Sequence, residues 1–391
     1  MSELKYNIGF LFLLESIKYV YKAKKFAVYL PEEILTNIFL RLGVKSLLRC
    51  KSVSKTWLSV ISNPHFVKSQ LHRAVMNPTL LFIDYPRSYA ANLRGRRPFD
   101  IFPRRVLPPL FEDCDVVSCS YNGIICLCDD NDVIYLWNPS IWEFKKLPPA
   151  PRRRPRRLAK YDKIAFGYDS ISDDYKVLRL LYENSRDVSR KVYLYSTNTD
   201  SWRRFQDPIL RKLNGYGQTD IVVDGVLYIK NGRELITFDL HQEVSGLVPL
   251  PDSVERIVSN VLDFEGSVGI VFQSVGDAEG IYLWTLDDTS GQMQWTRKFK
   301  INAYSGSRLW IYCYLGSGDF YGRMVPAHDF FFHNFLYDHQ TEETKFHGVQ
   351  ENVCATVKYA MTLVSPDGLK ALASILATLS GKKRSRGSSV D

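Results

Sequence analysis

The feature that most constrains the fold is a unit of short apolar strands that recurs along the chain beyond residue 79. Each unit has a Gly-led apolar strand, a polar turn and a second strand that ends in an aromatic residue. Successive aromatic ends lie 58, 43, 46 and 53 residues apart, at Trp137, Tyr195, Phe238, Trp284 and Tyr337. A period of about 50 residues made of short strands is typical of propeller blades. The pattern therefore predicts a large all-β domain, a β-propeller-like array, with a β-sandwich as the alternative because similar strands build both folds.

Three of these units carry a Trp with basic neighbours after their last turn: Trp142, Trp202 and Trp295. Buried aromatic side chains dominate core energetics, so we expect these residues to pack between successive blades rather than to bind a ligand. The kelch repeat is the nearest well-defined relative of the pattern. The sequence has no Gly-Gly pair, so the match to that repeat is partial.

The segment before the β region has a helical period instead. Pro31 suits a first helical position, and Glu32 and Glu33 follow where the helix dipole favours negative charge. Gly43 ends that first helix, two further short helices follow, and Pro64 ends the third. Three short helices make a poor core on their own. Their apolar surplus predicts packing on another protein or, alternatively, on the rest of this chain.

The string LPEEIL from Leu30, with IFLRL from Ile38 and KSLLRCKSVSKTW from Lys45, resembles an F-box. It is most similar to the F-boxes of the plant proteins that carry a C-terminal F-box-associated interaction domain. Gly43 stands where that family often has Pro, and Cys50 where it often has Phe. The resemblance implies a small three-helix F-box ahead of the β domain, and so an α+β chain by segments.

The start of the β region carries the second half of the resemblance. The pieces CSYNG from Cys119, LWNPS from Leu136 and FGYD from Phe166 look like the beginning of the F-box-associated domain. The chain is accordingly divided into five parts. These are an N-terminal extension without assigned function (1–28), the F-box (29–70), a connecting segment (71–110), the F-box-associated β domain (111–365) and a basic, partly disordered tail (366–391).

The resemblance implies that the F-box docks on a Skp-type adaptor, and through it on a cullin, while the β domain holds a target protein for ubiquitination and degradation. Such a chain is a non-catalytic receptor subunit of an SCF-type ubiquitin ligase. The adaptor should meet the apolar face, because aliphatic and aromatic anchors dominate such interfaces. The predicted adaptor-binding residues are Leu30, Pro31, Ile34, Leu35, Ile38, Leu42, Leu47, Leu48, Val53 and Trp57. The alternatives are an adaptor-binding scaffold protein without target turnover, and a propeller enzyme with a helical accessory.

The net charge of +9 is concentrated in two short stretches and the C-terminal tail, so the rest of the chain is slightly acidic. That distribution disfavours a nucleic-acid partner, which needs a basic face interleaved with aromatics. Clustered Arg residues recognise phosphate or carboxylate bidentately. The candidate target-binding residues are therefore Arg152, Arg153, Arg154, Arg156 and Arg157, with a solvated loop or a nuclear import signal as the alternative.

No catalytic or cofactor motif is present. The sequence lacks a nucleophile-elbow Gly-x-Ser-x-Gly, a phosphate-binding Gly-Lys-Ser/Thr and a His-Glu-x-x-His. Its seven Cys residues are irregularly spaced without a Cys-x-x-Cys. The spacing of His328, His333, His339 and His347 does not place all four on one strand face. We therefore expect no metal and no cofactor. No apolar run reaches the ~18 residues of a membrane span, so we expect no membrane partner and a cytoplasmic or nuclear location.

Overall fold

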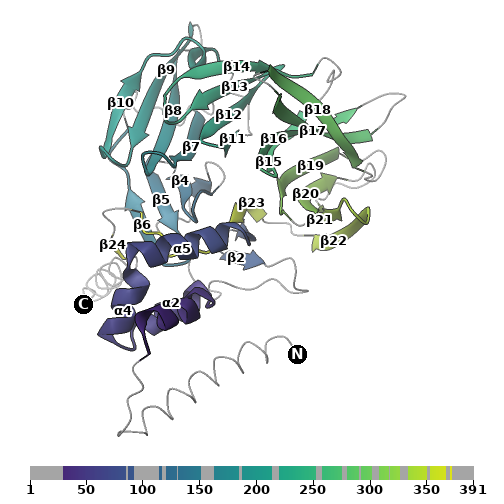
Figure 1. Ribbon diagram of the computed structural model, residues 1–391. Coiled ribbons are helices and arrows are strands. Elements are labelled where there is room, and N and C mark those ends of the chain that lie inside the picture. Colours follow the sequence, from purple (N-terminus) through teal and green to yellow (C-terminus); the bar gives the residue numbers. More distant parts are fainter. Residues whose placement is uncertain are drawn as a thin grey trace, which may run out of the picture. The chain divides into compact units, whose positions relative to one another are not determined.

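The computed structural model describes most of the two predicted regions. The described residues are 30–84, 87–91, 114–116, 120–129, 131–150, 163–184, 187–213, 220–251, 258–274, 280–289, 292–301, 308–316, 318–325, 333–349, 353–366 and 370–371. The chain divides into two compact units, Met1–Gln70 and Leu71–Asp391. The first is helical in its described part, and the second is almost entirely β-structure (Figure 1).

Four helices form the helical part: α2 (Glu32–Leu40), α3 (Val44–Lys51), α4 (Lys55–Ser62) and α5 (Pro64–Val75). The first three follow the predicted pattern. The fourth was not expected, because Pro64 was taken only as the end of α4. Proline also suits a first helical position, where its missing N–H has no intrahelical partner to lose. The boundary between the two units, after Gln70, falls inside α5.

The β unit contains five sheets of four or five strands, which we number blades 1 to 5. Blade 1 consists of β3 (Cys114–Val116), β4 (Ile125–Asp129), β5 (Ile134–Asn138), β6 (Glu143–Lys146) and β24 (Lys370–Ala371). Blade 2 consists of β7 (Lys163–Asp169), β8 (Asp174–Asn184), β9 (Asp187–Ser196) and β10 (Ser201–Phe205), followed by the short 3-10 helix η2 (Leu210–Lys212). Blade 3 consists of β11 (Asp220–Val223), β12 (Val226–Asn231), β13 (Glu234–Asp239) and β14 (Ser245–Pro249).

Blade 4 consists of β15 (Val258–Phe264), β16 (Ser267–Ser274), β17 (Gly280–Thr289) and β18 (Gln292–Ile301). Blade 5 consists of β19 (Arg308–Tyr314), β20 (Asp319–Val325), β21 (His333–Asp338) and β22 (Glu343–Val349). A further three-stranded sheet, the closing sheet, joins β1 (Thr79–Asp84) and β2 (Arg87–Ala91) to β23 (Val353–Tyr359). All the strand pairs are antiparallel, as hairpin connections require.

The sheets follow one another around a closed ring. The first strands of blades 2, 3, 4 and 5 are neighbours in turn, and β19 is in turn a neighbour of β23 in the closing sheet. Residues just after β23 then bond to blade 1. Figure 1 shows this ring along its axis, with the inner strands around the middle. The prediction of a β-propeller is therefore confirmed and the sandwich alternative set aside.

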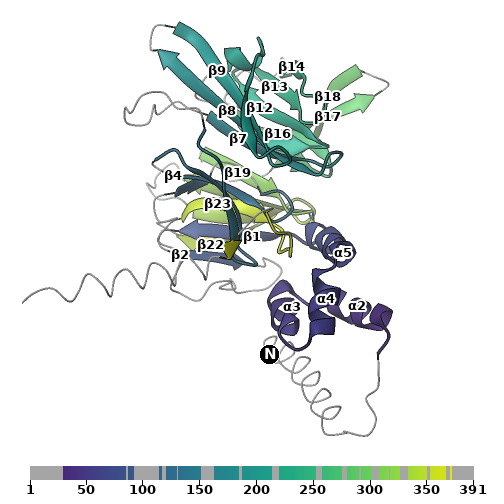
Figure 2. The same ribbon diagram turned by 90° about the vertical axis from the view of Figure 1, so that its left-hand side faces the viewer.

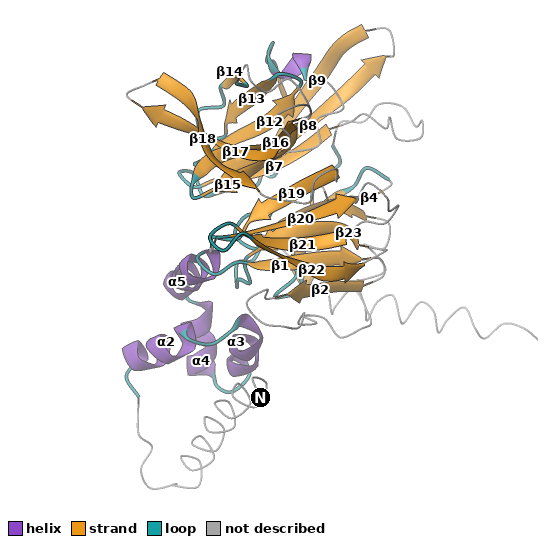
Figure 3. Cartoon of the chain, turned by 90° about the vertical axis from the view of Figure 1, so that its right-hand side faces the viewer, coloured by secondary structure: helices purple, strands orange, loops and turns teal. Residues whose placement is uncertain are grey.

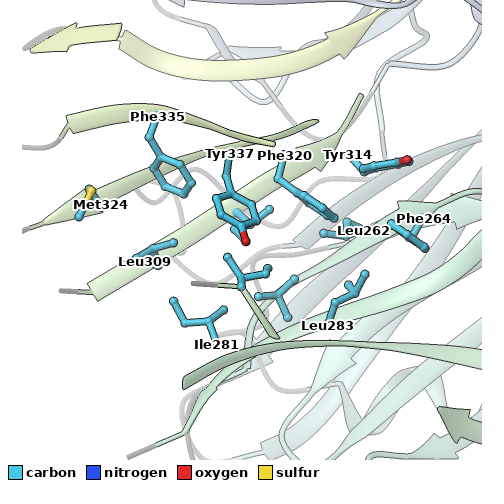
Figure 4. Packing of buried hydrophobic residues seen from close by; sticks show 13 residues of the cluster. Leu262, Phe264, Ile281, Leu283, Leu309, Tyr314, Phe320, Met324, Phe335 and Tyr337 are labelled. Carbon is cyan, nitrogen blue, oxygen red and sulfur yellow. The ribbon is translucent and has the colours of Figure 1, made fainter. Parts of the chain in front are cut away.

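Apolar side chains from adjacent sheets fill the junctions between consecutive blades. Between blades 4 and 5, for example, Leu262 and Leu283 pack with Phe320 and Tyr337 from the next sheet. Figure 4 shows these side chains pointing toward one another from the two sheets. Phe264 stacks on Phe320 with ring centroids 6.0 Å apart. Because sheet faces are buried against neighbours in this way, each blade depends on the two beside it.

Two of the three predicted inter-blade tryptophans make the same contact. Trp202 in blade 2 donates Nε1–H to the carbonyl of Pro148 beyond blade 1, at 2.9 Å. Trp295 in blade 4 donates to the carbonyl of Pro249 at the end of blade 3, at 2.7 Å. Each Trp thus ties the outer strand of its blade to the end of the preceding one.

Trp142 does not occupy the register position that Trp202 holds in blade 2. Trp142 lies in the β5–β6 turn in the left-handed conformation, with φ of 59°. In blade 2, Trp202 pairs with Tyr195 on the neighbouring strand. In blade 1, the residue that pairs with Trp137 in the same way is Phe144, which is buried. In blade 4 the residue opposite Trp295 is Leu286, two positions after the aromatic end that the repeat suggested. The corresponding turns of blades 1 and 2 have the same length, so the two blades differ only in which residue the sequence places opposite the aromatic strand end.

A buried polar cluster closes the ring between blade 1 and the residues around β23. Asn138 donates from Nδ2 to the carbonyl oxygens of Thr362 (3.2 Å) and Val364 (2.7 Å). Tyr359 donates its hydroxyl to Asn138 Oδ1 at 2.9 Å and accepts from the backbone N–H of Ser140 at 3.0 Å. Burial is complete at Asn138, Tyr359 and Thr362, so leaving any partner unpaired would be costly.

An ion cluster joins blades 2 and 3. The Lys176 ammonium lies 3.5 Å from Asp169 and 3.2 Å from Glu243, and it also donates to the carbonyl of Leu240. Asp169 is buried, which by itself disfavours its charge. The hydrogen bonds from Ser172 and His241 outweigh that burial and hold the pKa of the Asp169 carboxyl well below its usual range. The cluster therefore depends on an ionised Asp169.

The first prediction concerns ring closure. Gly123 has φ of +77°, and a Cβ there would meet Thr362 Oγ1 and lie 2.5 Å from the backbone oxygen of Ala360. We expect Gly123→Ala to lower the free energy of unfolding by about 3 kcal/mol through this overlap and the backbone strain. Gly225→Ala is the matched control, because Gly225 has the same φ and open space around it; it should cost about 1 kcal/mol. Guanidinium unfolding of the full chain measures both, and equal losses would contradict the closure argument.

The second prediction concerns pH. The folded pKa of Asp169 is below its unfolded value of about 3.9. Its contribution to stability is therefore complete above about pH 4 and lost as the pH falls toward the folded pKa. We expect Asp169→Asn to cost about 3 kcal/mol at pH 7 and progressively less below about pH 4. Asp287→Asn, which breaks the exposed pair with Lys298, should cost about 0.5 kcal/mol at pH 7. A pH-independent loss for Asp169→Asn would refute the ionised cluster.

Candidate protein-docking surfaces

The helical part is organised around one buried aromatic side chain. Phe39 in α2 makes an edge-to-face contact with Trp57 in α4, with ring centroids 5.0 Å apart, and another with Phe66 in α5 at 6.5 Å. Such contacts add to the gain from burial. The other buried apolar residues of this part are Leu35, Val44, Leu47, Cys50, Val60 and Ile61. Phe66 shows that α5 completes a core that the first three helices leave open.

Local sequence fixes the entry to α4. Ser54 is its N-cap and accepts the backbone N–H of Trp57 at Oγ, at 3.1 Å. This bond satisfies one of the unpaired N–H groups of the first turn and starts the helix in the register that turns Trp57 toward Phe39. Cys50, where the resembled family often has Phe, is buried, and burial raises the pKa of its thiol. It therefore serves as a small apolar core residue.

The predicted adaptor-binding residues fall into three groups. Leu30, Pro31, Ile34 and Val53 are exposed, and Ile38, Leu42, Leu48 and Trp57 are half-buried. Ile34 and Val53 keep 47% and 54% of their surface open, which is unusual for large aliphatic residues. Leu35 and Leu47 retain only 8% and 0%. Their assignment to the docking face is therefore corrected, because the helical period places them on the inner side with Phe39 and Cys50.

The sequence reasoning missed one exposed apolar residue between α2 and the end of α4. Leu58 in α4 keeps 45% of its surface open. The signal was available, because Trp57, Val60 and Ile61 recur at helical spacing and define the inner face of α4. Leu58 follows Trp57 by one residue and so lies off that face. With Leu30, Ile34 and Val53 it makes up the exposed apolar set of residues 30–62; Val75, the last residue of α5, is also exposed.

The candidate target-binding arginines, residues 152–157, lie outside the described residues, and their role stays a prediction. Of the four histidines considered as ligands, His339 donates its Nδ1–H to the carbonyl of Gly318 at 2.6 Å and stacks on Phe299. His328 lies outside the described residues, as does the side chain of His347. Within the described ranges, no group of three or more His, Cys, Asp or Glu side chains could hold a metal ion. Nor does any helix there combine the length and apolarity needed to cross a bilayer.

The third prediction separates the surface from the core of α2. Ile34→Asp should leave amide hydrogen exchange in residues 32–62 unchanged, because the new carboxylate remains in water. Leu35→Asp should raise exchange throughout those helices, because it buries an unpaired charge beside Phe39. Hydrogen–deuterium exchange of the full-length variants measures this. Similar exchange in the two variants would mean that the burial assignment of these neighbouring residues is wrong.

Comparison with known proteins matches both units. Residues 29–69 match the F-box domain family, and residues 110–364 match the F-box associated beta propeller domain family. The F-box protein CPR1 of Arabidopsis thaliana is 25% identical over 309 residues, covering 70% of this chain and 73% of that protein. A putative F-box protein of the same plant is 27% identical over 290 residues, covering 69% of this chain and 70% of that protein.

Among solved structures, a quinonprotein alcohol dehydrogenase-like protein of Bacteroides thetaiotaomicron is 9% identical, with a TM-score of 0.41 over 74% of this chain and 77% of that one. That similarity is too low to bear on function. The family matches span most of the chain and agree with its helical part and its ring of sheets. The chain belongs to the family of F-box proteins that carry a C-terminal F-box-associated β-propeller domain.

Proposed function

We propose that this chain is the substrate-recognition subunit of an SCF-type ubiquitin ligase complex. Its F-box binds a Skp-type adaptor, and through it a cullin, while the β-propeller binds a target protein for ubiquitination and proteasomal degradation. The observation that carries this proposal is the exposed apolar set Leu30, Ile34, Val53 and Leu58. These residues surround an aromatic core that is complete without them, so the apolar surface is available to a partner.

In this function the chain brings the target protein close to the conjugating enzyme and does not itself catalyse the reaction. Holding the target beside a charged ubiquitin-conjugating enzyme raises the effective concentration of the target lysines. No residue of this chain makes or breaks a bond in that scheme, and no cofactor is needed. The complex would act in the cytoplasm, the nucleus or both.

A second candidate is a scaffold protein that binds the adaptor without turnover of a target. It shares the same exposed apolar set, so adaptor binding does not separate the two. Ubiquitination of a co-purified partner in a reconstituted complex does. A target that binds and is never modified would favour the scaffold function.

The fourth prediction tests the adaptor surface directly. Ile34→Asp should weaken binding of the full chain to a Skp-type adaptor at least 100-fold, because a carboxylate would be buried in the apolar contact. The matched control is Ile171→Asp, a change of the same kind at an isoleucine of the propeller that is 73% exposed. It should leave binding within about twofold. Isothermal titration with purified adaptor gives both affinities. An unchanged affinity for Ile34→Asp would overturn the proposed docking face.

A further inference from the structure

The outer strand of blade 4 is longer than those of its neighbours. β18 has 10 residues, whereas the outer strands of blades 2, 3 and 5 have 5, 5 and 7. It pairs with β17 on its inner side and with no other strand in the described part of the chain. Its outer edge therefore presents a row of backbone N–H and C=O groups that a further strand would satisfy.

The strand is held in place by contacts on both of its faces. The register between β17 and β18 shifts where Leu283 pairs with Phe299 and Trp284 with Arg297, leaving Lys298 as an extra residue. This bulge turns Phe299 toward the core shared with blade 5, while Trp295 bonds back to blade 3. The contacts of Phe299 and Trp295 therefore hold β18 in place, so the position of its outer edge is fixed.

The exposed part of β18 is basic. Arg297, Lys298 and Lys300 are exposed, and the strand has no acidic residue. Lys298 pairs with Asp287 on β17 at 3.2 Å, which leaves a net positive edge. Met293, near the hairpin tip, keeps 59% of its surface open. Figures 2 and 3, from opposite sides, both show the β17–β18 hairpin extending beyond the neighbouring sheets.

Three of the other outer strands are less suited to this use. β14 ends at Pro249, which has no N–H to offer. In β10, the Arg203 guanidinium is engaged by Glu243 of blade 3. In blade 1, β6 is already covered by β24. Among the described strands, β18 combines length, a free edge and uncompensated positive charge.

We propose that β18 binds an extended acidic segment of the target protein by strand addition at its outer edge. Main-chain hydrogen bonds would supply affinity, and Arg297 and Lys300 would select acidic sequences. A second copy of this chain is a poor occupant, because its own β18 would bring three more cations to the same edge. The inference rests on the proposed function, since it specifies how the receptor recognises its target.

The test uses a fluorescein-labelled 10-residue peptide of alternating Glu and Val, titrated against the full chain by fluorescence anisotropy at low salt. The double variant Arg297→Glu/Lys300→Glu should weaken binding at least 10-fold. The matched control is Lys146→Glu/Arg204→Glu, which alters the net charge equally at exposed residues of two other outer strands. It should change the affinity less than threefold.

A second peptide with the same sequence, N-methylated at every residue, keeps the charge and loses the backbone donors. It should bind at least 10-fold more weakly than the parent peptide if pairing is by strand addition. Three results would overturn the proposal: no measurable binding of the parent peptide, equal binding of the methylated one, or an equal loss in the control variant. The last two would indicate attraction to the basic surface in general.

Adaptor titration of the same samples separates this inference from the proposed function. The double variant should bind the adaptor as the wild-type chain does, because β18 contributes nothing to the F-box surface. Adaptor binding without peptide binding would reject only the strand-addition site. Peptide binding without adaptor binding would reject the ligase function and leave β18 as the recognition edge of a binding protein.

Discussion

The propeller depends on the hydrogen bonds that close its ring. Strand β23 comes from the end of the β unit, yet it pairs with β1 from the beginning, Thr79 opposite Tyr359. The residues that follow it bond to blade 1 through Asn138. Because each blade buries its faces only against its two neighbours, an open ring would expose a sheet face at each end. Closure therefore buries the end faces of the five blades and the closing sheet, and this burial stabilises the β unit as a whole.

Polar contacts between blades repeat around the ring and set its geometry. The outer-strand Lys145 of blade 1 pairs with Asp200 in a turn of blade 2, and Arg203 of blade 2 pairs with Glu243 in the corresponding turn of blade 3. Asp200 and Glu243 both have positive φ, so the same turn conformation presents both carboxylates. Packing supplies most of the stability, while these pairs and the two Trp–carbonyl bonds fix the register of one blade against the next.

The helical part differs from the propeller in how its large apolar side chains are divided between core and surface. Its core around Phe39 is small, and it leaves large aliphatic side chains such as Ile34 and Leu58 open to solvent. In the propeller, comparable exposure is confined to scattered turn and edge positions, among them Ile171 and Met293. The described part of the helical unit thus exposes several large aliphatic side chains over a short segment, whereas the propeller has an outer strand, β18, with a net positive charge. The two surfaces suit two partners of different chemistry.

The sequence by itself determined the class of the fold and the presence of the N-terminal helices. The recurrence of aromatic strand ends predicted a propeller, and the helical period of the LPEEIL segment predicted helix α2. Only the tertiary structure decided three further points. It placed Leu35 and Leu47 inside, because several faces of a short helix can be apolar and only the packing around Phe39 selects the buried one. It placed Phe144 of blade 1 at the register position that Trp202 holds in blade 2, because strand pairing and not residue type decides which side chain lies there. It joined β1 to β23 and left the outer edge of β18 without a partner among the described strands. Pairing between strands distant along the chain has no period that a sequence displays.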